Sequence, residues 1–120
     1  MKLQESGENY LETILILEKR NGIARATDVA NELNFSKPSV SRAVSILKKA
    51  GYVEIGNINQ LLLTSTGREI AEHIYERHCI LTQYLTSIGV DQNTASEDAC
   101  RIEHVISETT FQCIKKIVKG

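Results

Sequence analysis

Residues 27–50, TDVANELNFSKPSVSRAVSILKKA, decide the fold because they contain two helical patterns joined by a tight connection. Thr27 is predicted to cap a short helix through Leu33, and a longer helix is predicted from Lys37 to about Ala50. Pro38 fits the first turn of the longer helix, where its missing N–H has no intrahelical partner. A short helix, a sharp turn and a longer helix are typical of a helix-turn-helix.

The sequence on either side extends this pattern to a winged helix-turn-helix. Residues 8–19 have the spacing of an amphipathic helix, with Ser6 available as its cap and Asn21-Gly22 as its end. Two β-rich runs, 52–55 and 60–63, flank four turn-forming residues and predict a hairpin, the wing. We therefore expect a mainly α protein whose first domain, residues 1–65, is a winged helix-turn-helix.

The remaining residues, 66–120, are predicted to form a second, helical domain. Thr64 is expected to cap a helix through about Ser87, a further helix is expected from about Thr94 to Ile106, and Ser107 begins the last one. No apolar run is long enough to span a bilayer, and the N-terminus lacks the layout of a signal peptide. We therefore expect a cytoplasmic protein.

Charge is distributed unevenly along the 120 residues, although the formal net charge is −1. Residues 19–49 contain seven basic and two acidic side chains, whereas residues 66–120 contain six basic and eight acidic ones. Contact with phosphate requires a local basic surface and not a positive net charge of the whole protein, so the first domain remains compatible with binding to nucleic acid. Cys79, Cys100 and Cys113 are odd in number and lack CxxC spacing, which argues against a disulfide framework.

The longer predicted helix, from Lys37 to about Ala50, is expected to contact DNA. The side opposite its apolar stripe is polar, and arginine can pair with guanine while hydroxyl groups contact base edges or phosphate. These side chains could instead only solvate a surface helix. The wing has no Lys or Arg, so its contacts are expected from asparagine. The predicted DNA-contacting residues are Arg25, Ser36, Lys37, Pro38, Ser39, Ser41, Arg42 and Asn57.

Cys100, Glu103 and His104 have a spacing that indicates a metal site. At positions i, i+3 and i+4 of a helix, their side chains project from one face toward a common point. A thiolate, a carboxylate and an imidazole together suit a first-row transition metal. The spacing alone also fits a core cysteine beside a surface ion pair.

The segment Ala99-Cys100-Arg101-Ile102-Glu103-His104-Val105-Ile106-Ser107 resembles the metal-binding helix of the diphtheria toxin repressor family of iron- and manganese-dependent regulators. The similarity extends in order and spacing through residues 8–11, 36–42, 63–67 and Arg77-His78. It implies a homodimeric, metal-dependent regulator of transcription and not an enzyme. We expect it to bind a double-stranded DNA operator and to repress metal-uptake genes. Because the sequence ends at Gly120, the expected form lacks the SH3-like domain of longer members.

The resemblance also implies a set of metal ligands. Cys100, Glu103 and His104 would bind the principal ion, joined by Asn9, where family members have methionine or aspartate. Glu12 and His78 match the ligands that manganese-responding members use for a second ion. The ancillary site of iron-responding members falls on Thr82 and Ser96 and is expected to be lost.

The predicted ligands leave the choice of metal open between two ions. The thiolate favours iron(II) and the oxygen donors suit manganese(II), so we expect Fe(II) first and Mn(II) next. Because the implied ligands come from both domains, the ion is expected to fix their orientation for operator binding.

Two alternatives remain at this point. One is a winged-helix regulator that has lost its response to metal, since Asn9 and Cys100 depart from an ideal ligand set. The other is a small metalloenzyme that uses His78, Glu103 and His104. The enzyme is disfavoured because no HExxH motif or pair of catalytic carboxylates occurs.

Overall fold

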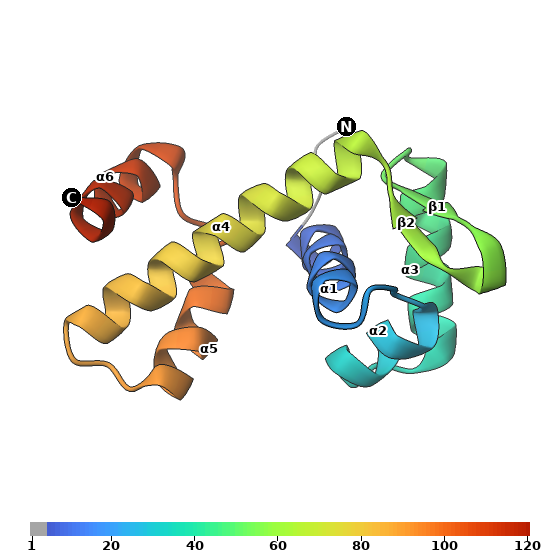
Figure 1. Cartoon of the computed structure of the whole chain (residues 1–120), viewed down its shortest axis with the longest axis horizontal. Helices are drawn as coiled ribbons and strands as arrows, with labels where there is room; N and C mark the ends of the chain where they lie inside the picture. The colour runs from blue at the N-terminus through green and yellow to red at the C-terminus, as the bar shows by residue number, and fades with distance from the viewer. Residues whose placement is uncertain (1–4) are drawn as a thin grey trace. The chain divides into compact units, whose positions relative to one another are not determined.

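The computed structural model describes residues 5–120 and divides into two compact units, Met1–Glu72 (unit 1) and His73–Gly120 (unit 2). The chain is mainly α-helical, as expected (Figure 1). None of the helices in residues 5–120 is long and apolar enough to cross a membrane. The elements are α1 (Glu5–Asn21), α2 (Ala26–Leu33), α3 (Lys37–Lys49), β1 (Val53–Ile55), the 3-10 turn η1 (Asn57–Asn59), β2 (Leu61–Leu63), α4 (Ser65–Ser87), α5 (Gln92–Ile102) and α6 (Glu108–Lys119).

Unit 1 contains the predicted helix-turn-helix, formed by α2 and α3 against α1. Its core is apolar and draws on all three helices, including Leu11, Ile14, Val29, Val40 and Leu47, all at most 3% exposed. The apolar stripes that the spacing predicted therefore pack together, which removes their surface from water.

The turn between α2 and α3 is fixed by local hydrogen bonds. Asn34 ends α2 in the left-handed conformation (φ 58°), and the N–H of Phe35 donates to the carbonyl of Ala30 (3.0 Å). Ser36 then caps α3 because its Oγ accepts from the backbone N–H of Ser39 (3.3 Å). Pro38 occupies the first turn of α3, which confirms the predicted start of that helix.

Two helix starts in unit 1 differ from the prediction. The cap of α2 is Arg25 and not Thr27, because the Asp28 carboxylate accepts the Arg25 N–H (3.1 Å) and the Arg25 carbonyl accepts from Val29 (3.1 Å). Helix α1 already includes Glu5, so Ser6 lies inside it and does not cap it. Amphipathic spacing locates the buried face of a helix but leaves its ends uncertain by a turn.

The wing is the predicted hairpin, with shorter strands. Strands β1 and β2 pair antiparallel in the register Val53↔Leu63, Glu54↔Leu62 and Ile55↔Leu61. Between them, Ile58 and Asn59 both have φ 58°, a conformation that a β-branched residue rarely adopts. The N–H of Leu61 donates to the carbonyl of Ala24 (2.8 Å), which ties the wing to the start of α2.

Gly67 fixes the junction between the wing and α4. A Cβ atom at this position would lie 2.0 Å from the carbonyl oxygen of Tyr52, so only glycine allows the two backbones to approach this closely. Thr64 caps the helix as predicted: its Oγ1 accepts from the Gly67 N–H (3.1 Å) and donates to the carbonyl of Gly51 (2.7 Å).

Unit 2 consists of the second part of α4 with α5 and α6 (Figure 1). Its buried side chains include Leu81, Ala95, Ala99 and Phe111. Asp91 caps α5 by accepting from the Thr94 N–H (3.0 Å), and Ser107 caps α6 by accepting from the Thr110 N–H (3.1 Å). The predicted cap of α6 is therefore confirmed.

Helix α5 is shifted from its predicted range of Thr94 to Ile106. It begins earlier because Asp91 caps it, and it ends at Ile102. Residues 103–106 form a turn, and the guanidinium group of Arg77 donates to the carbonyls of Glu103 (3.1 Å) and Ile106 (2.8 Å). These hydrogen bonds to a side chain satisfy backbone groups that a longer α5 would pair internally.

Candidate functional site

A buried carboxylate flanked by two imidazoles forms the candidate site in unit 2. The Glu103 side chain is completely buried, and its Oε2 lies 3.0 Å from Nδ1 of His78. Its Oε1 lies 3.3 Å from Nε2 of His104, whose side chain is 3% exposed. Helix α4 supplies His78, and the turn after α5 supplies Glu103 and His104.

These three residues are chemically suited to a divalent metal ion. A buried carboxylate is costly unless a positive charge or hydrogen bonds compensate it. Carboxylate oxygen and imidazole nitrogen are ligands of manganese, iron and zinc. Because Glu103 places one oxygen 3.0 Å from Nδ1 of His78 and the other 3.3 Å from Nε2 of His104, the carboxylate has an imidazole on either side, and this donor set of unit 2 suits such an ion.

Two hydroxyl groups contact His78, one at its ring and one at its backbone. Ser96 Oγ lies 3.5 Å from Nε2 of His78, and Thr82 Oγ1 donates to the His78 backbone carbonyl (2.7 Å). These are the two positions at which the ancillary site of iron-responding relatives was expected to be lost. Of the two, only the Ser96 hydroxyl lies next to the second ring nitrogen of His78.

The other predicted ligands lie in different environments. Cys100 is on α5 and exposed, whereas Glu103 follows the end of that helix and is completely buried. The motif thus spans the C-terminal end of α5, with Glu103 as the C-cap residue. Glu12 (4% exposed) and the half-buried Asn9 lie on α1 in unit 1. For Cys100, Glu12 and Asn9, metal ligation stays a prediction.

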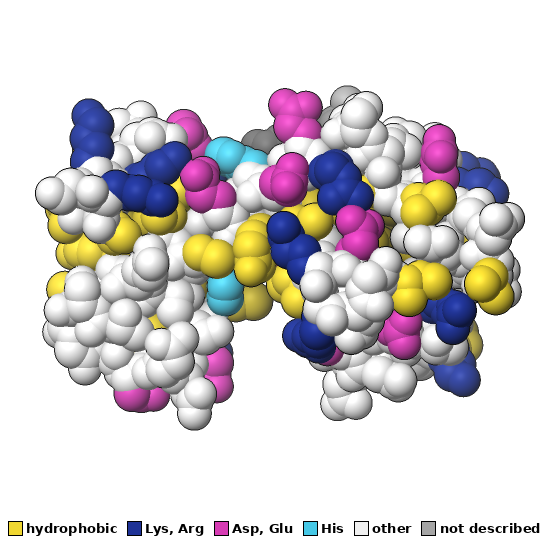
Figure 2. All heavy atoms as spheres, viewed as in Figure 1, with side chains coloured by type: hydrophobic (Ala, Val, Ile, Leu, Met, Phe, Trp, Pro, Cys, Tyr) yellow, Lys and Arg dark blue, Asp and Glu magenta, His cyan; other side chains and the backbone are white. Residues whose placement is uncertain are grey.

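The predicted DNA-contacting residues lie on the surface of unit 1. Six of them, at the start and along the polar side of α3, are exposed: Ser36, Lys37, Pro38, Ser39, Ser41 and Arg42. Asn57 in the wing is exposed, and Arg25 is half-buried at the start of α2. Among them lie exposed hydrophobic side chains, including Ile46 and Ile58. Figure 2 shows such hydrophobic patches beside Lys and Arg side chains on unit 1.

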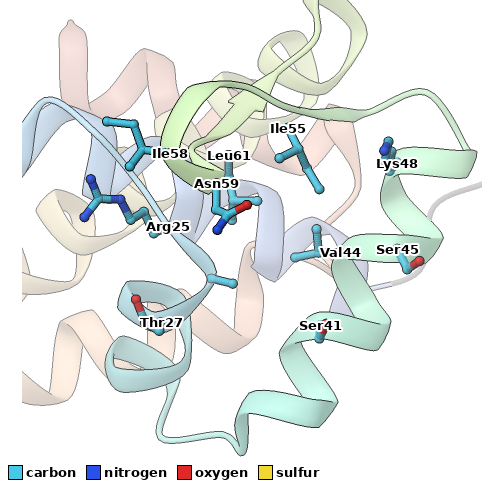
Figure 3. Close-up of a pocket in the computed structure, with 11 residues that line it drawn as sticks. Arg25, Thr27, Ser41, Val44, Ser45, Lys48, Ile55, Ile58, Asn59 and Leu61 are labelled. Atoms are coloured by element: carbon cyan, nitrogen blue, oxygen red, sulfur yellow. The ribbon is translucent and has the colours of Figure 1, made fainter.

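A cleft of about 550 Å³ lies between α3, the wing and the start of α2 (Figure 3). Val44 and Leu61 contribute apolar surface to it. Its polar lining consists of Arg25, Thr27, Ser41, Ser45, Lys48 and Asn59, each with an N–H or O–H donor and none acidic. Such a lining favours a negatively charged occupant.

Lys48 and Thr27 of this cleft were not among the predicted contacts. The sequence contains a signal for Lys48: Ser45 follows Ser41 by four residues and Lys48 follows Ser45 by three, so all three share one side of α3. Thr27 was interpreted as a cap, and that assignment hid its role in lining the cleft.

Comparisons with known proteins assign the chain to a class. Residues 2–57 match the model of the N-terminal DNA-binding domain of iron-dependent repressors, and residues 64–120 match the metal-binding and dimerisation domain of the same repressors. Together with the helix-turn-helix and the buried carboxylate–histidine cluster, these matches define a metal-dependent regulator class and not an enzyme class. The chain belongs to the iron-dependent repressor family.

Two curated relatives support this assignment. The diphtheria toxin repressor of Corynebacterium diphtheriae is 33% identical over 118 residues, which cover 98% of this chain and 52% of that protein. The transcriptional regulator MntR of Listeria welshimeri is 34% identical over 114 residues, which cover 95% of this chain and 80% of the relative. The chain thus spans about half the length of the diphtheria toxin repressor.

Solved structures show the same fold. The IdeR protein of T. acidophilum superimposes with a TM-score of 0.83 at 25% identity, over 100% of this chain and 56% of that one. The manganese regulator SloR superimposes with a TM-score of 0.82 at 24% identity, over 99% of this chain and 55% of that one. The predicted fold class and family are therefore confirmed.

Proposed function

We propose that this protein is a metal-dependent, DNA-binding regulator that represses metal-uptake genes in the cytoplasm when Fe(II) or Mn(II) is plentiful. One observation carries the proposal: Glu103 is completely buried, and its two oxygens face His78 and His104 at 3.0 and 3.3 Å. A divalent ion held by these side chains would place a positive charge beside the buried carboxylate.

Glu103, His104 and His78 are the proposed metal ligands of unit 2. We further propose Cys100, Asn9 and Glu12 as ligands, on the strength of the resemblance and the chemistry of their side chains. A thiolate ligand would favour Fe(II), and a set restricted to oxygen and nitrogen would favour Mn(II). The relative affinity of the two ions therefore depends on whether Cys100 takes part.

Helix α3 is the proposed DNA-reading helix. Arg42 would contact base edges in the major groove, because a guanidinium group can form two hydrogen bonds with guanine. The hydroxyls at the start of α3, together with Arg25 and Asn57, would contact phosphate and fix the orientation of the helix. Lys48 and the donors of the cleft add positive charge and hydrogen bonds beside this helix.

Unit 2 is the proposed dimerisation unit. Val105 is 73% exposed and Ile117 is 67% exposed, so unit 2 presents apolar side chains that a second copy would cover. A two-fold dimer presents two α3 helices to a two-fold operator. To shift such a dimer from 1:99 to 99:1 in favour of the binding-competent state, the metal must stabilise that state by about 5.5 kcal/mol.

The metal part of the proposal is tested by titrating Mn(II), or Fe(II) without oxygen, into chelator-treated protein. We expect the wild type to bind either ion, and Glu103→Gln and His104→Ala to lose most of the affinity. Glu97→Gln is the matched control, because Glu97 is an exposed acidic residue of α5. If Glu97→Gln lowers the affinity as much as Glu103→Gln does, the assigned site is wrong.

The DNA part is tested by selecting binding sequences from a random duplex pool with and without metal. We expect metal to enrich a two-fold sequence, Arg42→Ala to abolish this enrichment, and Arg101→Ala, an exposed arginine of α5, to leave it unchanged. If the same sequences are enriched with equal affinity in the presence of chelator, the protein is instead a regulator that has lost its response to metal.

A further inference from the structure

Arg77 on α4 is a buried cation adjacent in sequence to His78. Only 8% of the residue is exposed. Its Nη1 donates to the backbone carbonyls of Glu103 (3.1 Å) and Ile106 (2.8 Å), and its Nη2 donates to Glu108 Oε1 (3.0 Å). The guanidinium group therefore holds both ends of the turn 103–106 and the first residue of α6.

Two further contacts orient this guanidinium group and compensate its positive charge. Its central carbon lies 5.3 Å from the ring centroid of Phe111, which is completely buried on α6. Glu108 supplies the opposite charge, and hydrogen bonds from Gln112 and Arg77 hold the pKa of Glu108 below its ordinary value. Arginine is suited to this place because its planar group can donate in several fixed directions at once, which an ammonium group cannot do.

These contacts control residues that face the candidate metal centre. The turn that Arg77 holds contains Glu103 and His104, and the neighbouring His78 on α4 contacts the Glu103 carboxylate. The rotation of the 103–106 backbone sets where the Glu103 and His104 side chains point. Loss of the two carbonyl contacts would release this backbone while leaving all the proposed ligands in the chain.

We propose that Arg77 is a positioning residue for the metal centre, which holds the 103–106 turn so that Glu103 and His104 are preorganised for the ion. The inference rests on the proposed metal-binding function. Residues that do not bind the metal but hold its ligands in place typically contribute 10-fold to 100-fold to metal affinity. Arg77 would act in this way through the ligands' own backbone.

The test compares metal affinity in four full-length variants by titration of Mn(II) into chelator-treated protein. Arg77→Met keeps the length and apolar stem of the side chain but removes all its donors, and we expect affinity to fall at least about 10-fold. Arg77→Lys restores the charge but cannot reach both carbonyls and Glu108 together, so we expect partial rescue. Glu108→Gln keeps Arg77 and removes one charged partner, so we expect a smaller loss.

Lys115→Met is the matched control. Lys115 on α6 forms an ion pair with Glu76 on α4 (2.8 Å), so its removal also breaks a cationic contact between these helices but leaves the 103–106 turn untouched. We expect its metal affinity to stay within about twofold of the wild type. Hydrogen exchange of the metal-free proteins provides a second measurement, in which residues 103–107 should exchange faster in Arg77→Met and not in Lys115→Met.

The outcomes separate this inference from the proposed function. If the wild type binds no metal, the proposed function fails. If the wild type binds metal and Arg77→Met binds it equally well, or if Lys115→Met loses as much affinity, the positioning role is wrong while metal binding stands. If Arg77→Met does not fold, Arg77→Lys and Glu108→Gln provide the test. The inference would be overturned if both variants showed the metal affinity and the hydrogen exchange of the wild type.

Discussion

Among single residues, Gly67 illustrates how one missing side chain allows two elements to meet. It lies in the first turn of α4, and a Cβ atom there would overlap the carbonyl oxygen of Tyr52. In most helices alanine is more favourable than glycine, because glycine loses more backbone entropy on folding. At residue 67 the close backbone contact reverses this preference.

We therefore expect Gly67→Ala to destabilise the protein by about 1–3 kcal/mol, the usual range for inserting an atom into a packed site. The free energy of unfolding from urea denaturation measures the effect. Thr66→Ala is the control, since Thr66 is exposed and its replacement should change stability by less than about 0.5 kcal/mol. A Gly67→Ala variant as stable as the wild type would contradict the close approach.

At the level of single residues, the sequence predicted the side chains of the candidate site but not the neighbouring residues that contact them. Glu103 and His104 were predicted from their spacing and from the family resemblance, and His78 from the resemblance alone; the structure places the two histidines beside the Glu103 carboxylate. The role of Arg77 escaped prediction because its contacts reach 26 to 31 residues along the chain, where neither helical spacing nor capping rules apply. Spacing did not predict that Cys100 is exposed while Glu103, three residues later, is completely buried.

At the level of elements, helix types and order were predicted well and helix ends were not. Apolar spacing located α3 and the hairpin because burial imposes a period on the sequence. The end of each helix depends instead on one or two polar contacts, and several residues can compete for them. Thr27 and Asp28 compete at α2, and Asp91 and Thr94 at α5; in each case the aspartate accepts the N–H that fixes the first turn.

The Asp91 cap makes the stability of α5 depend on pH. Hydrogen bonds from Thr94 lower the pKa of Asp91 from its ordinary value of 3.8. Its stabilising contribution is complete above that ordinary value and is lost as the pH falls through the lower pKa of the folded state. We expect Asp91→Asn, which can still cap, to show a shallower fall in Tm than the wild type below about pH 4.

A thermal unfolding series from pH 7 to pH 2 measures this difference. Asp91→Ala serves as the comparison, because it removes the cap at every pH and should lower Tm at pH 7 as well. If Tm falls equally steeply with decreasing pH in the wild type and in Asp91→Asn, the charge of the Asp91 carboxylate does not contribute to stability.

At the level of the whole molecule, apolar surface on unit 2 bears on assembly. The exposed Ile117 lies on α6, the helix whose other side buries Phe111. Figure 2 shows hydrophobic side chains of unit 2 at the surface beside Lys and Arg side chains. A copy of the same chain can cover such a surface in a two-fold arrangement, which the match to a dimerisation domain supports.

We expect Ile117→Glu to raise the dimer dissociation constant at least about tenfold, which corresponds to about 1.4 kcal/mol. Sedimentation equilibrium over a range of concentrations measures it. Ile46→Glu is the control, since Ile46 is also an exposed isoleucine (57%) but lies on α3 in unit 1. Equal weakening by both substitutions would place the interface elsewhere.

The uncharged tip of the wing bears on how the proposed DNA binding depends on salt concentration. At this tip Ile58 is 74% exposed, and Asn57 and Asn59 flank it. Contacts made by lysine or arginine release counterions from DNA and therefore weaken as salt concentration rises. Apolar and amide contacts from this wing would not, so the proposed DNA binding should change less with salt concentration than that of a relative with a lysine-rich wing.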